Sequence, residues 1–87
     1  MEWDLTSFVV RSHYRKKVLL ELYKPQRPSQ IAQSSDFRLT HVTRALRELK
    51  QKKLVICLNP NDTFGRFYEL TQKGKNVVQN VMNLGKQ

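Results

Sequence analysis

The sequence is poor in the residues that build enzyme and metal sites. Its one cysteine, Cys57, excludes an intramolecular disulfide and a paired-cysteine zinc site, and it lies in an apolar run, where core packing is expected. The three glycines are too scattered to form a phosphate-cradling loop. Neither His13 nor His41 has a second ligand at metal spacing, and Ser29, Ser34 and Ser35 have no adjoining base. We therefore expect no enzyme activity, no metal and no cofactor.

Long hydrophobic runs are also missing. The longest, Phe8–Val10 and Leu54–Leu58, are far shorter than the ~20 residues that a bilayer-spanning helix needs. The acidic start, Met1–Asp4, lacks the basic character of a secretory signal. We expect no membrane association and a cytoplasmic location.

Positive charge is the property that the sequence has in excess. Its 87 residues include 16 Lys and Arg against 7 Asp and Glu, so the formal net charge is +9. Such an excess favours a polyanionic partner such as nucleic acid. A chain of this length buries roughly 60% of its unfolded surface, enough for one modest core. We expect residues 1–87 to form a single folded domain.

Apolar residues at three- and four-residue spacing predict helices in the first half of the chain. Ser12 is the expected N-cap of the first, and Pro25 is expected to stop it just after Lys24. A short helix from Gln30 to about Ser34 should follow, with Ser29 as its cap. The stretch Phe8–Val10 fits either a short strand or an earlier helical turn.

The clearest helix lies within Phe37–Lys53. Its apolar residues recur at intervals of three and four, and they are Leu39, Val42, Ala45, Leu46 and Leu49. Thr40 has the best chemistry for its N-cap, although Asp36 would start the helix one turn earlier. The sequence leaves the start of this helix open between these two residues.

The second half of the chain predicts a hairpin and a last helix. Leu54–Leu58 and Arg66–Leu70 have the composition of paired strands. The turn formers between them are too many for a tight turn, so a protruding loop is expected. Thr71 should cap the final helix. The order of elements predicts an α+β, mostly helical fold: a single winged helix-turn-helix domain with three helices, a two-stranded β-hairpin wing and a C-terminal helix.

Positive charge is concentrated on the candidate recognition helix. Residues 38–53 hold six basic residues and one acid, which is +5 of the total +9. Arginine binds guanine or phosphate, while Thr and His reach backbone oxygens or base edges. If the apolar residues of this helix face inward, the candidate DNA contacts are Arg38, Thr40, His41, Thr43, Arg44 and Arg47. A solvated helix in any protein also turns its charges outward.

Two motifs frame the second half of the chain. The first is Val-Thr-Arg-x-Leu-x-x-Leu over Val42–Leu49, leading into Leu54-Val55, and the second is Tyr-x-Leu-Thr-x-x-Gly over Tyr68–Gly74. Together they resemble winged helix-turn-helix transcriptional regulators of the MarR and ArsR type, especially the small archaeal members, over about residues 13–82. The resemblance implies a winged-helix fold, and it implies that Arg66 on the hairpin enters a minor groove. Lys53 departs from it, because the family usually has Gly there as a left-handed helix cap.

These features predict sequence-specific binding of double-stranded DNA, by a transcriptional regulator that acts through promoter occupancy. One alternative is a protein-protein interaction module within a larger complex, where the recognition helix often loses its basic face. The other is an RNA-binding module, which would use the same charge without base readout. No small-molecule effector is evident from the sequence.

A homodimer is the expected assembly, since two-fold pairing would double the DNA contacts. Apolar side chains of the terminal segments supply the material for its interface, namely Trp3, Phe8, Val78, Val81 and Met82. The alternative is that they close the core of the monomer.

Overall fold

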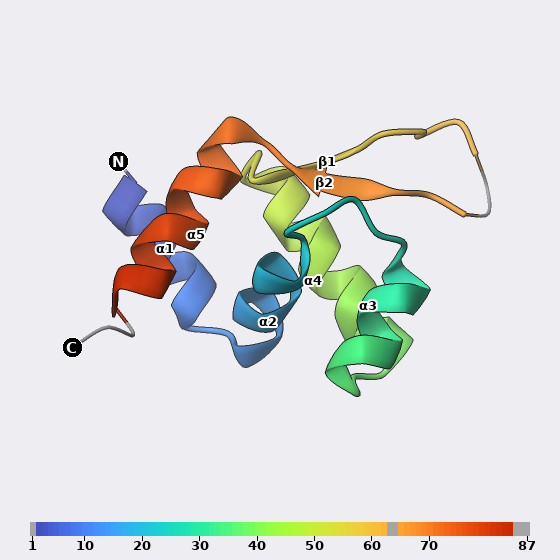
Figure 1. Ribbon diagram of the computed structural model, residues 1–87, viewed down its shortest axis with the longest axis horizontal. Helices are drawn as coiled ribbons and strands as arrows, with labels where there is room; N and C mark the ends of the chain where they lie inside the picture. The colour runs from blue at the N-terminus through green and yellow to red at the C-terminus, as the bar shows by residue number, and fades with distance from the viewer. Residues whose placement is uncertain (1, 63–64, 85–87) are drawn as a thin grey trace.

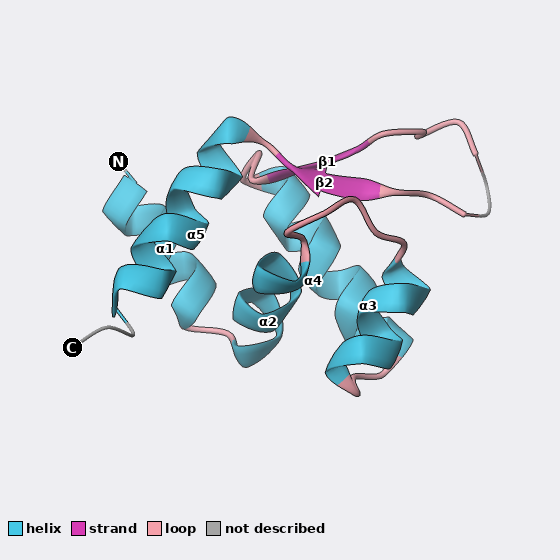
Figure 2. Cartoon of the chain, in the orientation of Figure 1, coloured by secondary structure: helices cyan, strands magenta, loops and turns pink. Residues whose placement is uncertain are grey.

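Five helices and one two-stranded hairpin make up the part of the chain that the computed structural model describes, residues 2–62 and 65–84. Figure 1 shows their arrangement, and Figure 2 shows how little of the molecule is strand. In chain order they are α1 (Glu2–Val10), α2 (His13–Glu21), α3 (Pro28–Ser35), α4 (Leu39–Gln51), β1 (Val55–Cys57), β2 (Tyr68–Leu70) and α5 (Gln72–Leu84). The predicted mostly helical α+β fold is confirmed, and the open choice at Phe8–Val10 is decided in favour of helix.

The terminal helices α1 and α5 lie side by side at one end of the molecule (Figure 1). Val9 and Val77 are fully buried and Val81 is 5% exposed, all within the same core cluster. The Asn80 amide donates to the Thr6 hydroxyl across this contact, with 3.2 Å between Nδ2 and Oγ1. Most of the apolar material of the terminal segments therefore closes the monomer core.

This arrangement corrects the predicted dimer interface. Val81 is buried within the monomer, and Val78 packs against the core. The ring of Phe8 also packs against the core and is covered by the Arg15 guanidinium, 4.0 Å from its centroid. Met82 is 52% exposed and stays available, while the side chain of Trp3 lies outside the described residues.

The inward face of α4 has the register that the spacing predicts. Val42 and Leu49 are fully buried, and Ala45 and Leu46 are 2% exposed. The helix packs on α2 and α3 in front of it in Figure 1. Burial of this face leaves the polar side of α4 in solvent.

Two of the predicted helix caps are confirmed, those of α2 and α5, and two are wrong, those of α3 and α4. The Ser12 hydroxyl accepts from the Arg15 amide at the start of α2, and the Thr71 hydroxyl accepts from the Gly74 amide at the start of α5, at 3.3 and 3.0 Å. The predicted cap at Ser29 is wrong, because α3 already begins at Pro28. Proline is preorganised for the first helical position, and the Gln30 side chain accepts from the Arg27 amide at 2.8 Å.

Neither candidate cap of α4 is its cap. Arg38 has extended backbone and precedes the first helical residue, so Thr40 lies inside the first turn. Asp36 instead ends α3 in the left-handed conformation, with φ of 61° and its amide bonded to the Ala32 carbonyl, because Asp tolerates this region better than most residues. At the other end of α4, Lys53 takes the same φ of 61° at the position where a glycine was expected.

The hairpin is antiparallel, with Val55 opposite Leu70 and Cys57 opposite Tyr68. Its strands are shorter than predicted, and they project from the body as a wing (Figure 1). Cys57 is half-buried and lies outside the core cluster, so the core packing expected for it is wrong. Gln26, in the α2–α3 connection, bridges Tyr68 through two backbone hydrogen bonds of 2.9 and 3.0 Å. This bridge ties the wing to the start of α3.

No helix within residues 2–62 and 65–84 is long and apolar enough to cross a membrane.

We predict that Gly74→Ala lowers the free energy of unfolding by about 2 to 3 kcal/mol, because overpacking forces backbone to move. A Cβ at Gly74 would lie 2.1 Å from the carbonyl oxygen of Leu54. Urea unfolding followed by circular dichroism measures the change. Gln79→Ala, on the exposed side of the same helix, is the control and should change stability little. Equal stability of the two variants would contradict the close approach.

Candidate nucleic-acid interface

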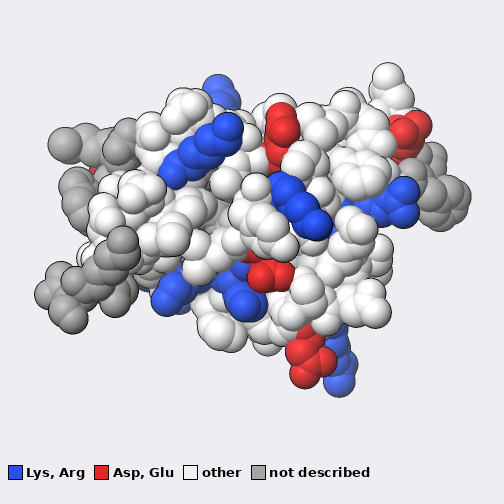
Figure 3. All heavy atoms as spheres, in the orientation of Figure 1, with Lys and Arg blue, Asp and Glu red and all other residues white. Residues whose placement is uncertain are grey.

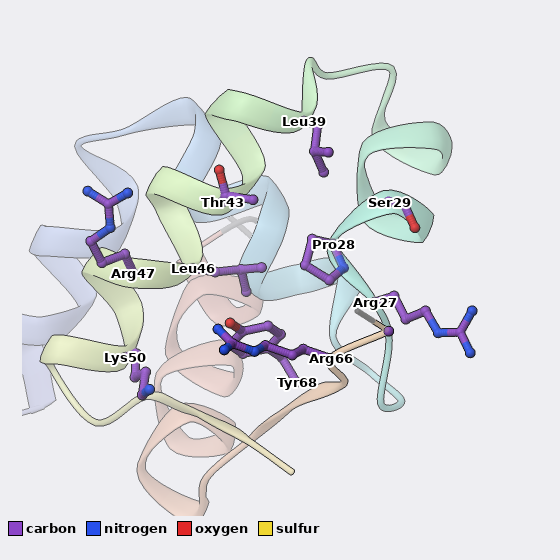
Figure 4. Close-up of a pocket in the computed structure, with 11 residues that line it drawn as sticks. Arg27, Pro28, Ser29, Leu39, Thr43, Leu46, Arg47, Lys50, Arg66 and Tyr68 are labelled. Carbon is purple, nitrogen blue, oxygen red and sulfur yellow. The ribbon is translucent and has the colours of Figure 1, made fainter. Parts of the chain in front are cut away.

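A hollow of about 570 Å³ lies between α4, the start of α3 and the wing. Figure 4 shows its residues, with Arg47 and Lys50 of α4 on one side, Arg27 and Ser29 on the other, and Arg66 and Tyr68 of the hairpin between them. We call this hollow the α4–wing groove. Its lining residues are Arg27, Pro28, Ser29, Leu39, Thr43, Leu46, Arg47, Lys50, Gly65, Arg66 and Tyr68.

The α4–wing groove is cationic. Four of its lining residues are Lys or Arg, and none of them is acidic. Arg27 stacks its guanidinium over the Phe67 ring at 4.8 Å, and Arg66 donates from Nε to the Asp62 carbonyl at 2.6 Å. Both side chains are thereby held by the wing while their charge remains exposed. The groove suits an anionic surface.

The structure brings only part of the predicted contact set together. Thr43, Arg47 and Arg66 line the α4–wing groove. Arg38 and Thr40 are exposed at the start of α4 without lining it. The remaining two, His41 and Arg44, line a different hollow of about 260 Å³ against α2. The outward arc that the sequence predicts is therefore divided between two surfaces.

His41 is held in an aromatic cluster. Its ring stacks on Tyr14, with 4.4 Å between centroids and 10° between planes. Tyr14 in turn meets the Phe37 ring at 4.9 Å, edge to face. The His41 side chain is half-buried, so this contact joins α4 to α2 and limits its reach outward.

Arg44 belongs to a series of polar contacts that connects α4 to α2 and α2 to α1. Its Nε lies 3.7 Å from one oxygen of Glu48, and Nη1 of Arg15 lies 3.3 Å from the other. Arg15 also donates from Nε and Nη2 to the Phe8 carbonyl near the end of α1, at 2.8 and 2.6 Å. Glu48 is the one acid of α4, and it offsets part of the positive charge beside Arg44.

Four groove residues with polar side chains are missing from the predicted set, namely Arg27, Ser29, Lys50 and Tyr68. Lys50 could have been found, because it lies one helical turn after Arg47 on the same face. Pro28 at the first position of α3 marks a helix start, and this signal points to the segment of Arg27 and Ser29. Tyr68 carries no such signal.

The face viewed in Figure 1 carries charges of both signs. Figure 3 shows Lys and Arg mixed with Asp and Glu over the face that is viewed in Figure 1. Within residues 2–62 and 65–84, no three His, Cys, Asp or Glu side chains gather in a way that would hold a metal ion.

No protein-family model matches the sequence, and no curated protein does. Solved structures do match. The reduced form of the transcriptional regulator YodB from B. subtilis is 17% identical and covers 95% of this chain and 84% of its own, with a TM-score of 0.81. A variant of MepR from a multidrug-resistant S. aureus isolate is 23% identical, over 86% of this chain and 57% of its own, with a TM-score of 0.77.

A further MarR-family transcription regulator is 18% identical over 95% of this chain and 62% of its own, with a TM-score of 0.77. The chain spans 57% to 62% of the length of the first three structures that it matches. The likeness to MarR-type winged-helix regulators that the two motifs indicate is confirmed at the level of the fold.

Proposed function

We propose that residues 1–87 act as one DNA-binding domain that recognises specific duplex DNA, and that the protein regulates transcription by occupying promoters. The observation that carries this proposal is the α4–wing groove, where α4, the hairpin and Arg27 just before α3 bring four cations and no acid to one hollow. The fold supports it, because solved proteins of this fold are named as transcription regulators.

In this proposal α4 enters the major groove and the wing lies over the adjacent minor groove. A major groove about 12 Å wide admits a helix, and arginine binds guanine there through two hydrogen bonds. Arg47 is the residue of α4 best placed for such a contact, because it is exposed and lines the groove. Arg66 extends from the hairpin, and a narrow minor groove attracts arginine.

The other cations would hold the phosphate backbone. Arg27 and Lys50 flank the groove on opposite sides, and Arg38 is exposed at the start of α4. Such contacts position a protein on the duplex without reading sequence. Thr40 remains a candidate backbone contact beside them, whereas His41 and Arg44 become peripheral because α2 and Glu48 engage them.

The alternatives fit the geometry less well. A protein-protein module does not need four exposed cations around one groove, and desolvating them without acidic partners would be costly. Duplex RNA has a deep, narrow major groove that side chains cannot read, so α4 would not insert there. We propose a cytoplasmic location for this function, and no catalysis, metal or cofactor.

We predict that log K for duplex DNA falls against log salt with a slope of about −4 to −5, for about five phosphate contacts. Fluorescence anisotropy with one labelled sequence as duplex DNA, duplex RNA and single strands measures it. Duplex DNA should bind most tightly at every salt concentration. A flat response, or equal binding of duplex RNA, would reject the proposal.

Arg47→Ala should weaken specific DNA binding by about 1 to 3 kcal/mol, as expected when a base or fixed phosphate contact is lost. Arg44→Ala should weaken it less, because Glu48 already offsets that charge. Anisotropy titrations of both variants measure this, with Lys73→Ala on the exposed side of α5 as the charge-matched control. Loss at Arg44 equal to that at Arg47 would contradict the division between the two hollows.

We also propose a homodimer that forms through the outer surface of α5 and the neighbouring part of α1. Met82 and Leu84 on α5 are 52% and 46% exposed, and Val10 on α1 is 38% exposed. The helices that carry them, α1 and α5, lie at the end of the molecule opposite the wing (Figure 1). Two copies joined there would leave both α4–wing grooves free, with half-sites roughly 34 Å apart.

Met82→Glu should convert a dimer at tens of micromolar into a monomer, because an unpaired carboxylate would have to be buried in the interface. Analytical ultracentrifugation measures the mass, and circular dichroism checks that the variant is folded. Asn83→Glu, which adds the same charge to the next residue, should remain dimeric. A wild-type chain that sediments as a monomer would rule the dimer out.

A further inference from the structure

Leu39 is an apolar side chain in a cationic groove. It stands at the first position of α4, and 49% of it is exposed. The other periodic apolar residues of this helix are all buried in the core. Leu39 lines the α4–wing groove instead, so core packing does not account for half of its surface.

Thr43, one turn further along α4, adds a second apolar group to the same groove. Its hydroxyl donates to the Thr40 carbonyl within the helix, with 3.1 Å between the oxygens. The hydroxyl proton is therefore engaged, and the methyl group is the part of Thr43 that is left for an apolar contact. Leu39 and Thr43 thus form an apolar step on the helix surface.

Arg47 lies on the same face of α4 as the apolar step and places a positive charge beyond it. Leu39, Thr43 and Arg47 are spaced by four residues each and all line the groove, as expected for one helix face. Positions 39 and 47 are about 12 Å apart along a helix axis. That distance corresponds to about three to four base steps of 3.4 Å. A ligand that complements this helix face has apolar groups opposite Leu39 and Thr43 and an anionic or hydrogen-bond-accepting group opposite Arg47.

Duplex DNA has one such apolar group on its major-groove edge, the C5 methyl of thymine. We propose that Leu39 and Thr43 recognise thymine methyl groups, so that the preferred sites carry thymine within about four base pairs of the position that Arg47 contacts. This inference rests on the proposed function. The cations that surround the step, Arg27, Lys50 and Arg66, favour a polyanionic duplex over an apolar protein surface as its occupant.

The first experiment removes the methyl group from the DNA. A preferred duplex is selected from a random pool with the full chain, and each thymine is then replaced singly by deoxyuridine, which keeps base pairing and loses only the methyl. Replacement at one or two positions should weaken binding about three- to fivefold, the effect of one buried methyl group. Replacement at the other thymines should have no effect.

The second experiment removes the apolar step from the protein. Leu39→Ala and Thr43→Ser should each weaken binding to the thymine duplex by a similar factor, and each should abolish the penalty at its own deoxyuridine position. Thr43→Val keeps the methyl and should keep the thymine preference. Ile56→Ala is the matched control, because Ile56 on β1 is an apolar side chain of similar exposure, 44%, that lies outside the groove, and it should behave as wild type. Thermal melts confirm that each variant is folded.

The outcomes separate the inference from the function on which it rests. Tight, salt-dependent binding of a selected duplex with no thymine sensitive to deoxyuridine would overturn thymine recognition and leave DNA binding standing. A thymine penalty that persists in Leu39→Ala and in Thr43→Ser would overturn the assignment to these two residues. Failure to select any duplex, with no preference over heparin, would reject DNA binding itself.

Discussion

The carbonyl oxygen of Leu54 is the point on which the arrangement of α4, the wing and α5 depends. It accepts one hydrogen bond from the Thr71 amide at 3.0 Å and another from the Thr71 hydroxyl at 3.2 Å. Gly74 approaches it so closely that no side chain would fit between them. One backbone group thereby joins the start of the hairpin to the start of the last helix.

The wing has a second attachment, which brings α3 into the same unit. Gln26 bridges Tyr68 through the backbone, and Arg27 follows it directly with its guanidinium over Phe67. The cation at the N-cap of α3, Arg27, is therefore positioned by the hairpin. Because the supporting contacts are backbone hydrogen bonds and ring stacking, the charge of Arg27 is held in place before a ligand binds, which lowers the entropic cost of binding.

The two ends of the molecule have different chemistry. The terminal helices α1 and α5 expose Val10, Met82 and Leu84, whereas the α4–wing groove exposes cations. Arg15 links the two ends, because it holds the Phe8 carbonyl of α1 and the Glu48 carboxylate of α4. An assembly at the terminal helices would therefore be connected to α4 by direct polar contacts.

The sequence alone determined the elements whose causes are local. The buried face of α4 follows from the apolar periodicity of its sequence. The caps at Ser12 and Thr71 follow from hydrogen bonds to residues three positions away, and Gly74 is the residue that the Thr71 hydroxyl caps. The helical state of Phe8–Val10 was not determined locally, because packing of α1 against α5 decides it. Tertiary structure alone also decided which cations share the groove. Arg27, Arg47 and Arg66 are about twenty residues apart in the chain, and periodicity within one helix carries no information about the distance between such segments.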